Sequence, residues 1–155
     1  MKRRAFLLTA VAAVPATAGA NNGSRSARAV QVAAGIDRND RGSKFESGGH
    51  LECKVSAKDT DGAMAVFVAL TTASDRPARH FHHDQDEWFY VIDGEYDFEV
   101  GNEKFHLKAG DSLFAPRKVP HAWACVSEKP GTLMATLQPA GTLEAFFQKL
   151  PQYVG

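Results

Sequence analysis

The chain has 155 residues, of which 44% are apolar, 23% charged and 10% aromatic. This composition excludes disordered, collagenous and disulfide-dense proteins and predicts one compact domain. The 18 basic and 18 acidic residues give a formal net charge of zero, so no basic surface that follows a phosphate backbone is expected, and nucleic-acid binding is disfavoured. The 13 glycines and 7 prolines lie mostly between short apolar runs, which favours many short strands over long helices.

The first twenty residues have the pattern of a bacterial export signal. Basic residues at 2–4 precede an apolar stretch over 5–14, and Ala18-Gly19-Ala20 supplies the small residues that signal peptidase accepts. The apolar stretch is too short to span a bilayer, which disfavours a membrane anchor. The run that begins Arg3-Arg4-Ala5-Phe6 resembles the twin-arginine signal, a route that carries folded proteins. We therefore predict a signal peptide over 1–20, a linker over 21–26, a folded domain over 27–155, and a periplasmic or secreted protein.

The apolar pattern after residue 27 is that of strands. Val30 and Val32 alternate with polar neighbours, as do Leu51, Cys53 and Val55, which is typical of half-buried strands. Residues 63–72 form a nearly continuous apolar run, which predicts a strand buried on both faces. Regular short strands separated by turns indicate a sandwich or barrel. Further strands are predicted at 79–83, 87–92, 96–100, 104–107, 112–115, 122–126 and 132–137.

A helical pattern is found near the carboxyl end, over 142–150. Thr142 can cap this helix and Glu144 lies in its first turn. Leu143, Phe146, Phe147 and Leu150 share one face of the predicted helix, which packing against the barrel would bury.

Cys53 and Cys125 are the two cysteines of the chain. In an oxidising compartment two cysteines can pair, although two alone do not make a disulfide framework. The sequence leaves their pairing open.

Residues that can bind a metal concentrate between positions 80 and 121. On a strand, residues two apart project from one face, so His80 and His82 can offer two imidazoles to one ion. Glu87 begins the next predicted strand and can return a carboxylate to the same face, and His121 opens a later strand. Three imidazoles and one carboxylate suit one divalent transition metal, Fe, Mn, Ni, Cu or Zn, and the ligand set does not choose among them. The alternative is a group of surface histidines beside an acidic loop.

Two segments, 74–94 and 110–125, resemble the two motifs of the cupin family. The first contains Ser74, His80-Phe81-His82, Glu87 and Gly94, and the second contains Gly110, Pro116-Arg117-Lys118, His121 and Cys125. All four metal-ligand positions of the family match. Ser74 and Lys118 stand where turn glycines are usual, and Cys125 where asparagine is usual. The resemblance implies an all-β fold, the double-stranded β-helix or jelly-roll barrel of cupins, with a short C-terminal helix.

A narrower likeness points to a reaction. Residues 87–95, 107–116, 120–123 and 139–147 are similar to single-domain proteins grouped with quercetin 2,3-dioxygenase. This likeness implies a metal-dependent dioxygenase that acts with O2 on a small enolic or phenolic, flavonol-like compound, with Glu87 as the catalytic base. Cupins also include non-catalytic binding proteins and isomerases or lyases of sugars or keto acids, which remain alternatives. Many cupins form dimers, so the resemblance also implies a homodimer as an assembly to test.

Residues on the same strand faces as the ligands are candidates for a pocket. Counting by two from Glu87 gives Phe89 and Val91, and counting from His121 gives Trp123 and Cys125, an aromatic and mostly dry lining. Their alternative role is barrel core. An apolar pocket favours an aromatic substrate, whereas a sugar acid would need cationic side chains, and the cations near the motifs are Arg79, Arg117 and Lys118. His83 has the opposite parity to His82, and we expect His83, His50 and His106 at the surface.

Overall fold

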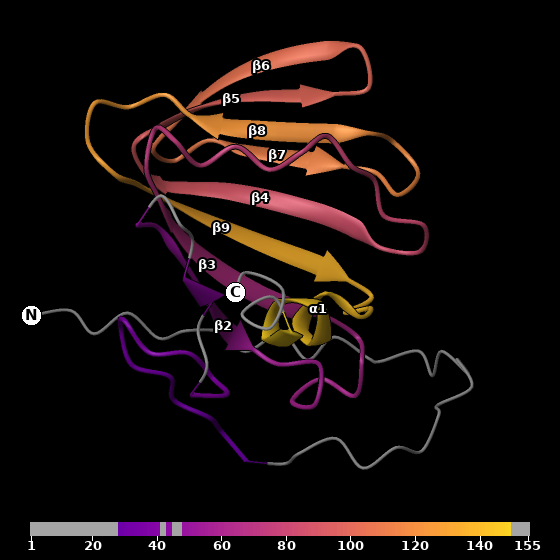
Figure 1. The fold of residues 1–155 in the computed structure, drawn as a ribbon. Coiled ribbons are helices and arrows are strands. Elements are labelled where there is room, and N and C mark those ends of the chain that lie inside the picture. Colours follow the sequence, from indigo (N-terminus) through magenta and orange to yellow (C-terminus); the bar gives the residue numbers. More distant parts are fainter. Residues whose placement is uncertain (1–27, 41–42, 45–47, 150–155) are drawn as a thin grey trace, which may run out of the picture.

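The computed structural model describes residues 28–40, 43–44 and 48–149. The predicted signal peptide and linker, with Ala27 and Leu150, lie outside the described residues. No helix within the described ranges is long and apolar enough to cross a membrane. The described strands form two antiparallel sheets (Figure 1). The strands are β1 (Ser43–Lys44), β2 (His50–Val55), β3 (Ala65–Thr71), β4 (Asp86–Asp93), β5 (Glu95–Val100), β6 (Glu103–Lys108), β7 (Ser112–Ala115), β8 (His121–Cys125) and β9 (Gly131–Gln138).

The larger sheet has the strand order β1-β2-β3-β9-β4-β7, and the smaller sheet has the order β6-β5-β8 (Figure 1). Alternation along the strands gives each sheet an apolar inner face. Phe89 of the larger sheet meets Phe98 of the smaller with ring centroids 4.9 Å apart. The core between the sheets consists of Phe89, Val91, Tyr96, Phe98, Leu107, Ala115, Cys125 and Leu133. This arrangement of two packed antiparallel sheets agrees with the all-β barrel that the motifs led us to expect.

A second core cluster forms where the helix α1 (Leu143–Lys149) covers the larger sheet. Phe147 packs on Phe67 of β3 with ring centroids 5.9 Å apart, and Leu143 contacts the same cluster. Phe146 is 56% exposed, so the prediction that it shares the buried face is wrong. Successive helical residues are rotated by about 100°, and the buried arc runs over 143, 147 and 144, which turns Phe146 toward solvent.

Strand β3 corrects the prediction of a strand buried on both faces. Ala65, Phe67, Ala69 and Thr71 are buried, but the residues between them are half-buried or, at Leu70, exposed. The sheet is antiparallel, and antiparallel sheets commonly leave one face to solvent. An unbroken apolar run therefore does not by itself prove burial on two sides.

Two predicted strands are absent from the described structure. Residues 28–40 contain turns and no strand, so the alternation of Val30 and Val32 does not mark one. The segment 79–83 makes a single β-bridge, between His80 and His121, instead of a strand. The other predicted strands agree with β2 and β4–β9 to within about two residues at their ends.

The turn between β4 and β5 requires glycine. Gly94 has φ +88°, and a Cβ there would lie 2.8 Å from the Ser127 hydroxyl oxygen and 2.9 Å from the Gly131 Cα. Both the conformation and the space exclude a side chain. This turn carries the chain from the larger sheet to the smaller one.

Cys53 and Cys125 are both free and buried. Cys53 belongs to the cluster under α1 and Cys125 to the core between the sheets. They are therefore not paired with each other in this structure.

Candidate metal centre

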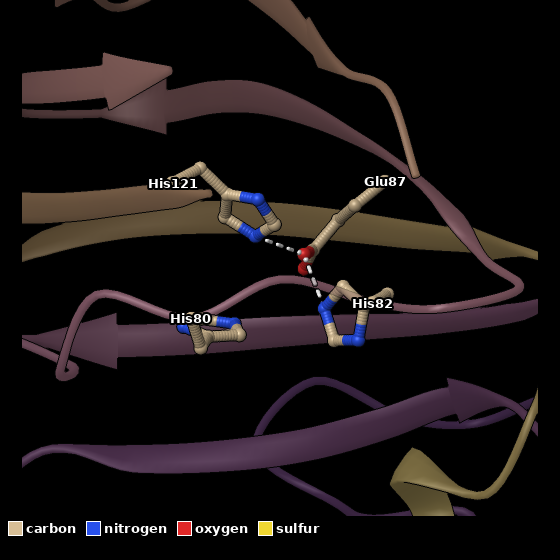
Figure 2. A group of neighbouring side chains, drawn as sticks. All are labelled: His80, His82, Glu87 and His121. Carbon is tan, nitrogen blue, oxygen red and sulfur yellow. Dashed lines mark hydrogen bonds and ion pairs between the residues drawn. The ribbon is translucent and has the colours of Figure 1, made fainter. Parts of the chain in front are cut away.

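Four side chains from three parts of the fold meet at one point. His80, His82, Glu87 and His121 each offer one ligand atom, and these atoms all lie within 4.8 Å of one another. Glu87 Oε2 lies 3.0 Å from His82 Nε2 and 3.0 Å from His121 Nε2. Figure 2 shows the carboxylate between these two rings, with the His80 ring beside them. The structure thus brings together all four residues predicted as ligands.

The backbone explains how these residues converge. Glu87 is the second residue of β4 and His121 the first of β8, so one comes from each sheet. His80 and His82 lie on the connection between β3 and β4, which runs beside β8. The His80 N–H donates to the His121 carbonyl at 3.0 Å, and the His121 N–H donates to the His80 carbonyl at 2.8 Å. The expectation that His80 and His82 share a regular strand is wrong, although both rings reach the predicted place.

Two of the imidazoles are oriented by backbone carbonyls. His80 Nδ1 lies 2.8 Å from the Ala78 carbonyl oxygen, and His121 Nδ1 lies 3.2 Å from that of Val119. A proton on Nδ1 that donates to these carbonyls leaves the Nε2 lone pair of each neutral ring for a ligand. His121 then has acceptors facing both ring nitrogens, since Glu87 Oε2 lies on its other side.

Burial and charge shape the protonation of the cluster. Burial raises the pKa of Glu87, but hydrogen bonds and positive charge from His121 and His82 outweigh burial and hold the pKa below its usual value. Burial lowers the pKa of His121, and the hydrogen bond and charge of Glu87 outweigh it, so that pKa is raised. Burial lowers the pKa of His80. Without a cation, the buried Glu87 carboxylate and His121 thus favour an ion pair.

These donors fit a divalent transition metal. Metal–ligand bonds of about 2.1 Å allow two ligand atoms of one ion to be at most about 4.2 Å apart, and the four ligand atoms here, all within 4.8 Å of one another, are near that range. Glu87 Oε2 and His121 Nε2 would both serve as ligands of such a metal, because a cation would accept a lone pair from each atom and the Nδ1 proton of His121 could still donate to the Val119 carbonyl. Imidazole and carboxylate together suit several first-row metals.

The four residues predicted to line a pocket differ in how deeply they are buried. Phe89 is buried in the core, and its ring lies 6.0 Å from that of His121. Trp123 is half-buried and packs against Tyr96 at 6.1 Å. Val91 and Cys125 have no exposed surface and belong to the core between the sheets. Contact of any of these four with a ligand stays a prediction.

The remaining histidines and cations lie as follows. His83 and His106 are exposed, and His50 is half-buried beside Glu52 at 2.8 Å. Arg79 donates to the Gly101 carbonyl and lies 3.5 Å from Glu99. Lys118 is exposed and has φ +64°, which agrees with the expectation that this motif position suits glycine.

One interaction beside the site was not predicted. The sequence marks Arg117 only as a cation near the motifs, whereas in the structure its guanidinium donates to both oxygens of Asp86, at 3.1 and 2.6 Å. This hydrogen bonding lowers the pKa of Asp86 to about 2, so the carboxylate is charged at neutral pH. The sequence gives only a slight sign of this pair: an acidic residue precedes Glu87, and a basic residue follows Pro116.

Comparison with known proteins agrees with the fold and the site. Residues 66–137 match the family model described as the Cupin domain. Quercetin 2,3-dioxygenase of Bacillus subtilis (strain 168) is 29% identical over 110 residues, which cover 70% of this chain and 32% of that protein. An RmlC-like cupin from Shewanella frigidimarina NCIMB 400 has a TM-score of 0.57 at 22% identity, covering 76% of this chain and 99% of its own. KdgF from Halomonas sp. also has a TM-score of 0.57, at 19% identity, covering 67% and 90%.

The fold and its cluster of three histidines and one glutamate define a double-stranded β-helix protein with a candidate metal centre. Together with the match of residues 66–137 to the Cupin domain model, the fold supports a cupin superfamily protein. The chain spans 32%, 61% and 53% of the lengths of the three curated relatives it matches, less than two thirds of each. Similarity to the solved structures concerns the fold alone, since fold does not imply function.

Proposed function

We propose that the protein is a metal-dependent dioxygenase that acts on a small enolic or phenolic compound. The observation that carries the proposal is the convergence of His80, His82, Glu87 and His121, with ligand atoms within 4.8 Å of one another. These four residues would hold one divalent transition metal. When bound, such a metal supplies Lewis acidity toward an enolate or phenolate oxygen. Similarity to the Bacillus quercetin 2,3-dioxygenase supports the choice of reaction.

Glu87 is the residue proposed to move a proton. Its carboxylate is 6% exposed and its pKa lies below the usual value, so it is deprotonated and shielded from bulk water. A substrate hydroxyl that enters the cluster can therefore give its proton to a Glu87 oxygen. Phe89, which is 1% exposed, packs against the His121 ring and helps to keep water from the inner side of the cluster.

A binding protein without turnover and an isomerase or lyase of a sugar or keto acid are the alternatives. A sugar acid needs cationic side chains at the site. Of the cations near the motifs, Arg79 is held by Gly101 and Glu99, and Arg117 is held by Asp86. These contacts occupy both arginines and leave the exposed Lys118 as the remaining one of the three cations, which disfavours an acidic substrate.

The metal is tested with one buried and one exposed histidine. His121 is buried in the cluster and His83 is exposed beside it. Protein isolated from metal-replete culture should hold about one equivalent of metal. A His121→Ala change should lower the occupancy strongly, because it removes an imidazole donor, while His83→Ala leaves it unchanged. Occupancy far below one equivalent, together with an unaffected His82→Ala variant, would exclude the metal site.

The reaction is tested by screening enolic, phenolic and dicarbonyl compounds for O2 uptake. A dioxygenase consumes O2 in proportion to substrate. A compound that binds tightly and is recovered unchanged, with no compound triggering O2 uptake, would move the protein to the binding class.

Export is a separate proposal that depends on residues 1–20. The basic, apolar and small-residue regions support removal after Ala20. The pair Arg3 and Arg4 supports the twin-arginine route. Replacing both with lysine should retain the precursor in the cytoplasm, and unimpaired export would instead indicate the general secretory route.

A further inference from the structure

The loop between β7 and β8 contacts every segment that carries a ligand of the candidate metal centre. The Lys118 N–H donates to the His82 carbonyl at 2.7 Å, and the Val119 carbonyl faces His121 Nδ1 at 3.2 Å. His121 follows directly after this loop and bridges to His80. Through Arg117, the loop also reaches the start of β4.

Arg117 binds Asp86 by three hydrogen bonds. The Arg117 N–H and Nε donate to Asp86 Oδ1 at 2.9 and 3.1 Å, and one terminal nitrogen donates to Oδ2 at 2.6 Å. The backbone N–H and the planar guanidinium together fix both the position and the orientation of the carboxylate. Asp86 is the first residue of β4 and immediately precedes Glu87.

Consecutive strand residues project to opposite faces, so Asp86 anchors the strand from outside while Glu87 points inward. We propose that Arg117 is a positioning residue for the metal centre: by clamping Asp86 it sets the place of the Glu87 carboxylate relative to His121. The inference rests on the proposed metal binding by these ligands. Its basis is the Arg117–Asp86–Glu87 connection between two segments that are 31 residues apart.

A second pair in the chain provides a matched control. Arg38 donates to Asp59 from Nε at 3.1 Å and from a terminal nitrogen at 2.9 Å, the same bidentate geometry. That pair joins residues 36–40 to the turn after β2, and its residues are not adjacent in sequence to any of the four candidate ligands. Both pairs are partly exposed, so neither is expected to dominate stability.

An electrostatic role and a positioning role of Arg117 predict opposite changes in metal affinity when Arg117 is replaced. Arg117→Gln removes a positive charge near a cation site. Because this relieves Coulomb repulsion between the side chain and the cation, electrostatics alone predicts tighter metal binding. If Arg117 positions Glu87, binding should become weaker. The expected change is at the low end of the about 10- to 100-fold that direct hydrogen-bond partners of metal ligands contribute, because Arg117 acts on Glu87 through Asp86. The sign of the change therefore separates the two explanations.

The experiment measures the Kd for Co²⁺ by competition with a chromophoric chelator, together with the visible spectrum of the Co²⁺ protein. Arg117→Gln should raise the Kd about tenfold and alter the spectrum, and Arg38→Gln should do neither. Asp86→Asn should weaken binding similarly, and the double variant should be no worse than either single one, because both changes break one clamp. Arg117→Lys keeps the charge without the planar fork and should restore only part of the affinity.

Circular dichroism and thermal unfolding check that each variant is folded, and Arg117→Lys, which keeps the charge and loses the planar fork, serves if Arg117→Gln does not fold. Unchanged or tighter Co²⁺ binding with the native spectrum in a folded variant would overturn the positioning role. Failure of the native protein to bind Co²⁺ would instead overturn the proposed metal function, so the two failures are distinguishable.

Discussion

Glu87 and Glu144 are both buried carboxylates, with exposed fractions of 6% and 9%, but their partners differ in kind. Glu144, in the first turn of α1, accepts hydrogen bonds at 2.8–3.0 Å from the Ser56 hydroxyl, the Ala57 N–H and the Asn39 amide. Glu87 instead faces the imidazoles of His82 and His121. Neutral donors fix the position of the Glu144 side chain.

The comparison shows how partners decide the role of a buried acid. Asn39, Ser56 and Ala57 all donate hydrogen bonds to Glu144, so Glu144 ties residues 36–40 and the turn after β2 to the helix. Imidazoles can lose a proton and bind a cation through the freed lone pair. Glu87 is therefore suited to chemistry, and Glu144 to stability.

The largest expected effect separates the two glutamates by activity. Glu87→Gln keeps the shape and one weak oxygen donor but cannot accept a proton, so turnover should fall about 10²- to 10⁴-fold. Metal content should be largely retained. Glu144→Gln should leave the turnover of folded protein unchanged. Rates of O2 uptake and metal analysis measure these quantities, and native turnover in Glu87→Gln would remove Glu87 from the base role.

The second-largest expected effect separates Glu144 from Glu87 by its contribution to the stability of the fold. Glu144→Ala leaves the donors of Ser56, Ala57 and Asn39 without their acceptor, which should lower the free energy of unfolding by about 3 kcal/mol. Metal affinity of the folded protein should not change. Gln148→Ala, at an exposed site of the same helix, is the control and should have little effect. Urea unfolding tests this, and equal stability of the two variants would contradict the role of Glu144.

A smaller effect concerns Cys53, which lies in the core cluster under α1. Burial, with the negative charge of Glu144, raises the pKa of Cys53 to about 12, so only about 10⁻⁴ of the thiol is ionised at pH 8. Native protein should therefore react slowly at Cys53 with a thiol reagent, and Glu144→Ala should accelerate the reaction by opening this region. Mass spectrometry of labelled peptides gives the rate at each cysteine. Fast labelling of Cys53 in native protein would show that the cluster is already open.

The smallest effect is expected in the loop beside Glu87. The left-handed conformation of Lys118, with φ +64°, costs a residue with a Cβ about 1 kcal/mol. Lys118→Gly should remove this cost, although glycine also gains freedom in the unfolded chain, so the net gain in stability should be below about 1 kcal/mol. Lys118→Ala loses the same charge but keeps the Cβ and should gain nothing. Urea unfolding of both variants isolates the backbone contribution, and an alanine variant as stable as the glycine variant would argue against it.

The sequence by itself determined the fold class and the four candidate ligands. Motif spacing placed His80, His82, Glu87 and His121 in one site, and period-two alternation located most of the strands. These signals are local or have a fixed order along the chain, so they can be read without coordinates. Lys118 likewise marked a position suited to glycine before its φ was known.

Tertiary structure decided the rest, because the deciding contacts join residues far apart in the sequence. The helix residue Glu144 meets Ser56 across 88 positions and Arg117 meets Asp86 across 31, and no local pattern predicts either partner. The same reason explains the errors at 79–83 and in β3. Whether an apolar run is covered on its second face, or a histidine segment forms a strand or a single bridge, depends on which distant segment packs beside it.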